Sequence, residues 1–109
     1  MDDATSQAAR TKQADAAGAL AELLRHHGLP AIGWYIASDE ARVEGQLYRE
    51  SETAVRAGLA AFADVLGVEI TESQHEDDSG TTWVQPAVES RYKGVQVAIL
   101  GPVHTGSVP

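Results

Sequence analysis

The 109-residue sequence contains no cysteine. Disulfide bonds, thiolate catalysis, cysteine zinc sites and iron–sulfur clusters are therefore excluded together. The sequence also has no run near the roughly 18 apolar residues of a membrane-spanning helix. Its start, MDDATSQAAR, is acidic and polar, whereas a secretory signal is basic and then apolar. We therefore expect a cytoplasmic protein without membrane contact, and its preference for alanine and arginine is typical of GC-rich bacterial coding sequences.

Positive charge is scarce as well. Lysine and arginine number 8 against 16 aspartates and glutamates, which gives a net charge of −8 and an isoelectric point of about 4.8. Phosphate backbones and anionic membranes bind clustered positive charge, so direct nucleic-acid binding is disfavoured. The exception is an inhibitor that imitates DNA with a stripe of carboxylates. The candidates for such a stripe are Asp39, Glu40, Glu69, Glu72, Glu76, Asp77 and Asp78.

Apolar residues make up 43% of the chain, enough for the core of one small domain. Residues 1–13 carry no apolar side chain larger than alanine after Met1, so we expect a disordered arm. Residues 14–100 contain the periodic segments and form the predicted single α+β domain. Residues 101–109 show no periodicity and predict a flexible tail.

The clearest segment is SETAVRAGLAAFADVLGVEI, which begins at Ser51. Ser51 is placed to cap a helix, and Gly67 follows the last apolar residue of the helical pattern. The large apolar residues recur at the spacing of one helical face. They are Val55, Leu59, Phe62 and Leu66. An earlier helix is predicted from about Asp15 to the stop at Gly28.

A first hairpin is predicted from the two β-like segments 31–37 and 42–48. If the last residue of the first strand pairs with the first residue of the second, Trp34 lies opposite Gly45. This register places every large apolar residue of the hairpin on one side. Such a division is typical of an antiparallel sheet with one covered face.

The remaining strands follow the central helix. We expect a strand over 68–72, an acidic loop over 73–80 and a strand over 81–92, in which Pro86 indicates an edge position or a bulge. A two-residue Lys-Gly turn then leads into a last strand, 95–100, and pairs the residues on either side of the turn.

These segments predict a two-layer α+β sandwich of order α-β-β-α-β-β-β, with two helices on one face of a mostly antiparallel five-stranded sheet. The segments that begin at Ala17 and at Ala57 both run helix, glycine stop, strand. This similarity suggests a duplicated α-β-β unit.

The sequence shows no catalytic signature. No serine elbow or phosphate loop is present, so we expect a protein that is not an enzyme and binds no cofactor. The sequence His75-Glu76-Asp77-Asp78 lacks the ligand spacing of a calcium loop, and the adjacent His26 and His27 would point about 100° apart on a helix. We therefore assign no catalytic, cofactor-binding or metal-binding residue.

The outer face of the predicted sheet, opposite the helices, is the preferred candidate site. Tyrosine and arginine among polar groups are typical of protein interfaces, because they bury area and still form hydrogen bonds. The residues predicted to bind a protein partner there are Tyr35, Arg42, Glu44, Tyr48, Glu89 and Arg91. The leading hypothesis is a small interaction module that binds a protein partner or itself, as a homodimer. One alternative to this module is a small-molecule-binding domain with a pocket near Trp34 and Trp83, and the other is the acidic DNA mimic described above.

Overall fold

A computed structural model of the protein describes residues 3–26, 28–38 and 40–104. The predicted order of two helices and five strands is confirmed, and a two-residue strand is added at the end. The elements are α1 (Asp3–Leu23), β1 (Gly33–Ile36), β2 (Arg42–Gln46), α2 (Glu52–Leu66), β3 (Thr71–Glu76), β4 (Thr82–Tyr92), β5 (Val95–Leu100) and β6 (Val103–His104).

Helix α2 begins and ends where its sequence predicts. The Ser51 side chain accepts a hydrogen bond of 3.1 Å from the Ala54 N–H, which satisfies one of the free amides of the first turn. Gly67 ends the helix in the left-handed conformation, with φ at 71°, and its N–H donates to the Ala63 carbonyl. Both caps are local, so they fix the ends of α2 without any distant contact.

The sheet has the strand order β1-β2-β5-β4-β3, and β6 pairs with β4. Strands β2 and β5 are parallel, and the other neighbours are antiparallel. The mostly antiparallel sheet is thus confirmed, with one parallel pair at its centre. Strand β5 lies between the β1–β2 and β3–β4 hairpins. The two helix–strand segments that suggest a duplicated unit therefore do not pair with each other, and duplication stays a prediction.

The predicted hairpin registers are confirmed. Trp34 lies opposite Gly45, where a methyl group would approach within 2.9 Å of the tryptophan ring, so glycine makes room for the indole. Tyr92 pairs with Val95 across the turn at Lys93 and Gly94. Both turn residues have positive φ, 54° and 80°, as a type I′ turn requires.

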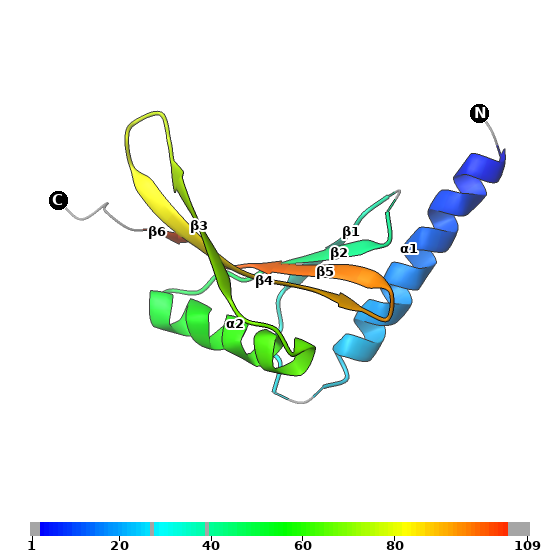
Figure 1. The fold of residues 1–109 in the computed structure, drawn as a ribbon, viewed down its shortest axis with the longest axis horizontal. Helices are drawn as coiled ribbons and strands as arrows, with labels where there is room; N and C mark the ends of the chain where they lie inside the picture. Colours follow the sequence, from blue (N-terminus) through cyan, green and yellow to red (C-terminus); the bar gives the residue numbers. More distant parts are fainter. Residues whose placement is uncertain (1–2, 27, 39, 105–109) are drawn as a thin grey trace.

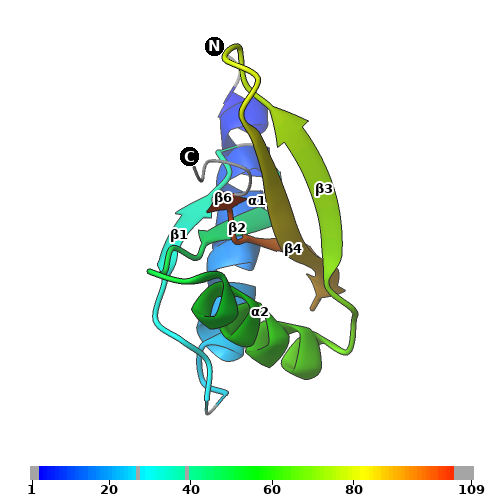
Figure 2. The ribbon, with the colours of Figure 1, turned by 90° about the vertical axis from the view of Figure 1, so that its left-hand side faces the viewer.

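Both helices pack on the same face of the sheet, as predicted. Figure 1 shows α2 beneath the sheet and α1 crossing it at one end, and Figure 2 gives the same layers from the side. Both helices and the strands β2, β4 and β5 contribute to the fully buried centre. Its residues include Leu23, Val43, Leu47, Leu59, Phe62, Val88, Val97 and Ile99. Among the described residues no buried side chain is polar or charged, so the core is held by apolar packing.

Helix α1 replaces the predicted disordered arm over residues 3–13, and the first two residues of that predicted arm lie outside the described part of the chain. The helix begins at Asp3, about twelve residues before the expected start, because alanine, glutamine and lysine favour helix even without packing. Among the α1 residues whose burial is described, from Ser6 onward, the buried ones lie in the second half of the helix, from Ala16 to Leu23. The first half therefore projects beyond the sheet (Figure 1).

Strand β4 is longer and more regular than Pro86 suggests. Pro86 is buried and paired with Glu72 of β3, so the ladder continues through it. The interruption occurs instead in the strand on the other side of β4. There the paired strand changes from β5 to β6 at Gly101. The Gly101 N–H donates to the Pro86 carbonyl at 3.0 Å, and the register of β4 with β5 continues unchanged into β6.

The predicted tail, 101–109, is therefore in part a strand. Val103 is 7% exposed and pairs with Val84, because β4 extends beyond β5 and offers a free ladder there. Gly101 lies so close to α2 that a methyl group would meet Val55 at 2.6 Å. Residues 105–109 lie outside the described part of the chain.

The β3–β4 hairpin also differs from the prediction. Its first strand is Thr71–Glu76, not 68–72, and all six of its residues are exposed, so the predicted acidic loop is mostly strand. The hairpin projects from the sheet on the side opposite α2 (Figures 1 and 2). A ribbon outside the core needs no apolar alternation, which explains why its polar sequence indicated a loop.

Candidate functional site

The outer face is the side of the sheet opposite the helices. Strand β2 shows how the chain builds it: Val43 and Gly45 are buried toward the core. Because side chains alternate along a strand, Arg42, Glu44 and Gln46 point to the outer face. Each of these three side chains is half-buried.

These three residues and Tyr48, two positions after β2, form a continuous chain of hydrogen bonds, called the polar ladder below: Arg42, Glu44, Gln46 and Tyr48. Arg42 Nη2 donates to Glu44 Oε1 at 3.3 Å, and Gln46 Nε2 donates to Glu44 Oε2 at 3.1 Å. The Tyr48 hydroxyl donates to Gln46 Oε1 at 2.8 Å. The tyrosine ring is nevertheless 65% exposed. The ladder thus holds an exposed aromatic ring and both Glu44 oxygens in defined positions.

Strands on both sides of β2 extend this face. Tyr35 of β1 lies opposite Glu44 and is 62% exposed. On the other side Glu44 lies opposite Ala98 of β5, which in turn lies opposite Glu89 of β4. Ala98 is fully buried between the two glutamate positions. The centre of the outer face is therefore small and apolar, with acidic groups on either side.

A second row of outward side chains crosses β2, β5 and β4 next to the row of Glu44, Ala98 and Glu89. Arg42 lies opposite Gln96 of β5, and Gln96 lies opposite Arg91 of β4. Arg91 also donates to the Gly94 carbonyl at 3.4 Å, which holds its side chain near the turn. The structure therefore brings the six predicted protein-binding residues onto one face, and their role in binding stays a prediction.

The two tryptophans proposed for a ligand pocket are not brought together. Trp34 points to the core side of β1 and contacts Phe62 edge-to-face, with ring centroids 5.8 Å apart. Trp83 lies on the projecting hairpin and stacks on His75, with centroids 4.3 Å apart. The strand alternation places Trp83 on the opposite face of the sheet from Trp34. They cannot line one pocket in this fold.

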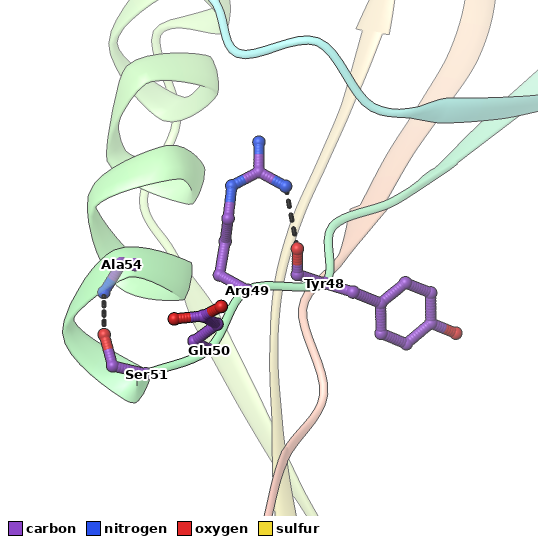
Figure 3. Close-up of a pocket in the computed structure, with 5 residues that line it drawn as sticks. All are labelled: Tyr48, Arg49, Glu50, Ser51 and Ala54. Atoms are coloured by element: carbon purple, nitrogen blue, oxygen red, sulfur yellow. Dashed lines mark hydrogen bonds between the residues drawn. The ribbon is translucent and has the colours of Figure 1, made fainter.

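Two open hollows adjoin the start of α2, where sequence reasoning placed no site. Figure 3 shows the first, between Ser51, Glu50 and Arg49, with the Tyr48 ring pointing away from it. Arg49 Nη1 donates to the Tyr48 carbonyl at 2.7 Å, so its cation is partly engaged. The Ser51 hydroxyl caps Ala54. With Glu50 beside it, this helix start is poorly suited to an anion.

The second hollow, of about 230 Å³, lies between the same segment and the end of the sheet. It is lined by Arg49, Glu50, Ser51, Glu52, Val55, Pro102 and Val103. The only local sequence signal for either hollow is the helix start at Ser51, which by itself indicates capping rather than binding.

The acidic residues proposed as a DNA-like stripe have other roles or lie apart. Glu72 pairs with Arg56 of α2, which also pairs with Glu52. The hydrogen bond to Glu72, and to a smaller extent the one to Glu52, raises the pKa of the Arg56 guanidinium. The Asp77 carboxylate accepts bonds from the Ser79 and Thr81 amides and so orders the hairpin turn. Glu40 belongs to the other hairpin, and Asp39 lies outside the described residues.

Groups suited to catalysis or metal binding are sparse. Ser73 Oγ lies 2.9 Å from His75 Nε2, but both side chains are exposed on the projecting β3. Within the described part of the chain, no group of three or more histidine, aspartate or glutamate side chains is arranged to hold a metal ion. His26 lies 3.4 Å from the Tyr92 hydroxyl, and His27 is not among the described residues.

Neither described helix has both the length and the apolarity needed to cross a bilayer. Comparisons of the chain with protein-family models, with curated proteins and with solved structures found no match.

Proposed function

We propose that this protein is a non-enzymatic interaction module that binds a protein partner through the outer face and also self-associates. The observation that supports this proposal best is the polar ladder, which holds Tyr48 in place while its ring stays 65% exposed. The opposite face is covered by both helices, so the outer face is the broad surface left for a partner. A cytoplasmic location stays a prediction.

Side chains that are already ordered lower the free-energy cost of binding a partner. A partner that immobilises free side chains loses roughly 0.5–1.5 kcal/mol for each one, and this cost falls when the side chains are already held. In the ladder, Glu44 and Gln46 are held by hydrogen bonds before any partner arrives. Tyrosine adds area with few rotatable bonds, so Tyr35 and Tyr48 are the expected anchors.

The chemistry of the face favours a basic or mixed partner. Glu44 and Glu89 flank the buried Ala98, and the whole chain carries a net charge of −8. Arg42 and Arg91 supply donors on the adjacent row, so a partner with a few acceptors among basic groups is complementary. Charge reversal at Glu44 or Glu89 is therefore expected to weaken binding.

The test selects peptides from a displayed library on the immobilised protein and measures their affinities by calorimetry. The double variant Tyr35→Ala, Tyr48→Ala is expected to weaken the selected peptides at least about tenfold, since aromatic anchors carry much of such binding. Leu24→Ala is the control, because Leu24, in the turn just after α1, is 47% exposed and its substitution also removes apolar surface. Equal affinities for the double variant and the parent would reject the outer face as the site.

The small-molecule binder and the DNA mimic remain alternative predictions. A small-molecule site shared by Trp34 and Trp83 is disfavoured by their positions on opposite faces. A DNA-mimic role predicts that the protein displaces DNA from a basic protein at low salt. Displacement of that kind would favour the mimic over the interaction module.

A further inference from the structure

The two edges of the sheet differ in charge. One edge is β3, which carries Glu72 and Glu76 and continues into Asp77 and Asp78. Charged side chains of this kind are how proteins keep edge strands from pairing with other chains. The other edge is β1, with sequence GWYI. No aspartate, glutamate, lysine or arginine occurs between Arg25 and Asp39.

Strand β1 has free backbone groups on its outer side. The Ala37 N–H donates to the Arg42 carbonyl at 3.1 Å, and bonded pairs alternate along an antiparallel ladder. Gly33 and Tyr35 therefore bond to β2, while the amide and carbonyl groups of Trp34 and Ile36 point to the free edge. Those four groups per chain are available to another strand.

We propose that two copies of this chain associate by antiparallel pairing of their β1 edges, giving one continuous sheet across a two-fold axis. This inference specifies the self-association named in the proposed function and rests on that part of it. Partner binding by the outer face does not depend on it.

The β1 edge is the one at which two copies of this chain can pair without bringing charged side chains together. Two molecules of net charge −8 repel each other over most of their surfaces, and β1 is an edge that brings no charged side chain into contact. Pairing two β3 edges would instead place Glu72 and Glu76 near their copies, which is unfavourable.

The register follows from the free backbone groups. Trp34 bonds with Ile36 of the second copy and Ile36 with its Trp34, so the two Tyr35 residues lie directly opposite each other. Residues opposite in a ladder share a face, which keeps both outer faces on one side and all four helices on the other. Non-bonded pairs bring their side chains closest, so the two Tyr35 rings are in contact.

The expected dimer is weak. A pair of four-residue strands buries much less than the roughly 1,200 Å² of a standard stable interface. Association is therefore measured by sedimentation equilibrium from about 10 μM to about 1 mM, a range suited to weak complexes. The parent protein is expected to approach twice its monomer mass at the upper end.

The variant that tests the register is Tyr35→Lys, with Tyr48→Lys as a matched control. Both tyrosines are highly exposed, 62% and 65%, so neither substitution disturbs the core, and thermal melts verify that both variants fold. Tyr35→Lys places two cations opposite each other at the two-fold axis and is expected to weaken dimerisation at least about tenfold. Tyr48→Lys is expected to dimerise as the parent does.

A charge-pair experiment completes the test. Tyr35→Lys and Tyr35→Glu are each expected to be monomers, and an equimolar mixture is expected to recover the dimer, because opposite charges then meet at position 35. Amide exchange at Trp34 and Ile36 is expected to slow as the parent concentration rises. A parent that stays monomeric, a mixture that stays monomeric, or Tyr48→Lys weakening the dimer as much as Tyr35→Lys would overturn the edge pairing. The last result would leave the outer face as the proposed site.

Discussion

The first hairpin, β1–β2, lies against the core, whereas the second, β3–β4, extends away from it. Along β2, exposure alternates residue by residue, and the buried residues contact the helices. Along β3 every residue is exposed, although it is paired with β4 over its whole length. Burial of one face, and not pairing itself, therefore imposes the alternating pattern on a strand.

The largest test of this comparison removes one side chain from each hairpin. Leu47, which follows β2, is fully buried, so Leu47→Ala is expected to lower the free energy of unfolding by about 2–5 kcal/mol. Gln74→Ala on the exposed β3 is expected to change it by less than about 0.5 kcal/mol. Urea unfolding measures both, and similar losses would show that the second hairpin is also part of the core.

Each hairpin requires a glycine for a different physical reason, and substitutions at Gly45 and Gly80 distinguish the two reasons. A methyl group at Gly45 would lie 2.7 Å from Ile32 Cδ1, so Gly45→Ala is expected to cost about 1–3 kcal/mol through crowding. A methyl group at Gly80 would make only an ordinary contact, 3.9 Å from Glu76 Oε1, but φ there is +85°, so Gly80→Ala is expected to cost about 1–2 kcal/mol through backbone strain.

Asparagine distinguishes the two causes. It tolerates left-handed backbone, so Gly80→Asn is expected to recover part of the loss of Gly80→Ala. It is larger than alanine, so Gly45→Asn is expected to be worse than Gly45→Ala. Thermal unfolding of the four variants measures this, and the same ranking at both positions would contradict it.

The turn of the second hairpin depends on one carboxylate. Asp77 Oδ1 accepts bonds from the Ser79 amide at 2.9 Å and the Thr81 amide at 3.0 Å. Asp77→Ala is expected to weaken the local order by roughly 1 kcal/mol, about a fivefold faster amide exchange at both residues. Asp78→Ala is the neighbouring control. Equal acceleration in both variants would indicate a general charge effect.

The smallest effect is expected where the second hairpin meets α2. Arg56 is bonded to Glu72 of β3, and both side chains are more than one-third exposed. Glu72→Gln is expected to cost about 0.2–1 kcal/mol, and less at high salt, which screens exposed pairs. A double-mutant cycle with Arg56→Gln isolates the pair.

The pH dependence of this pair follows from the arginine. Because Glu72 raises the pKa of Arg56, the stabilisation is fully present below the ordinary arginine pKa and is lost only as pH rises beyond it. Unfolding measured at pH 7 and pH 9 should give the same coupling energy for Arg56 with Glu72. A coupling that falls over this interval would contradict the assignment to this pair.

Local signals predicted the parts of the fold that local contacts determine. The caps at Ser51 and Gly67 were legible because their hydrogen bonds lie within α2, and the register at Trp34 followed from apolar alternation. The same alternation identified the outward residues of the candidate site. Nothing local indicated the hydrogen bonds that join Tyr48 to the rest of the polar ladder.

Sequence reasoning failed where the structure depends on distant neighbours. Pro86 indicated an interruption of β4, but the effect fell on its partner at Gly101, which no local pattern reveals. The helix over the first half of α1 has no apolar face, so periodicity could not detect it. The parallel pairing of β2 with β5 leaves no mark in either strand.

That central parallel pair has a consequence for how the chain folds. It places Arg42 beside Gln96, 54 positions further along the chain. Each hairpin can form from residues close in sequence, whereas the middle of the sheet forms only when this distant segment is present. Closing so long a loop costs entropy before its contacts form, which slows folding. During synthesis, the apolar sides of β2 and β4 therefore stay open until β5 has left the ribosome. A chain stopped before Val95 is expected to aggregate rather than fold into a smaller domain.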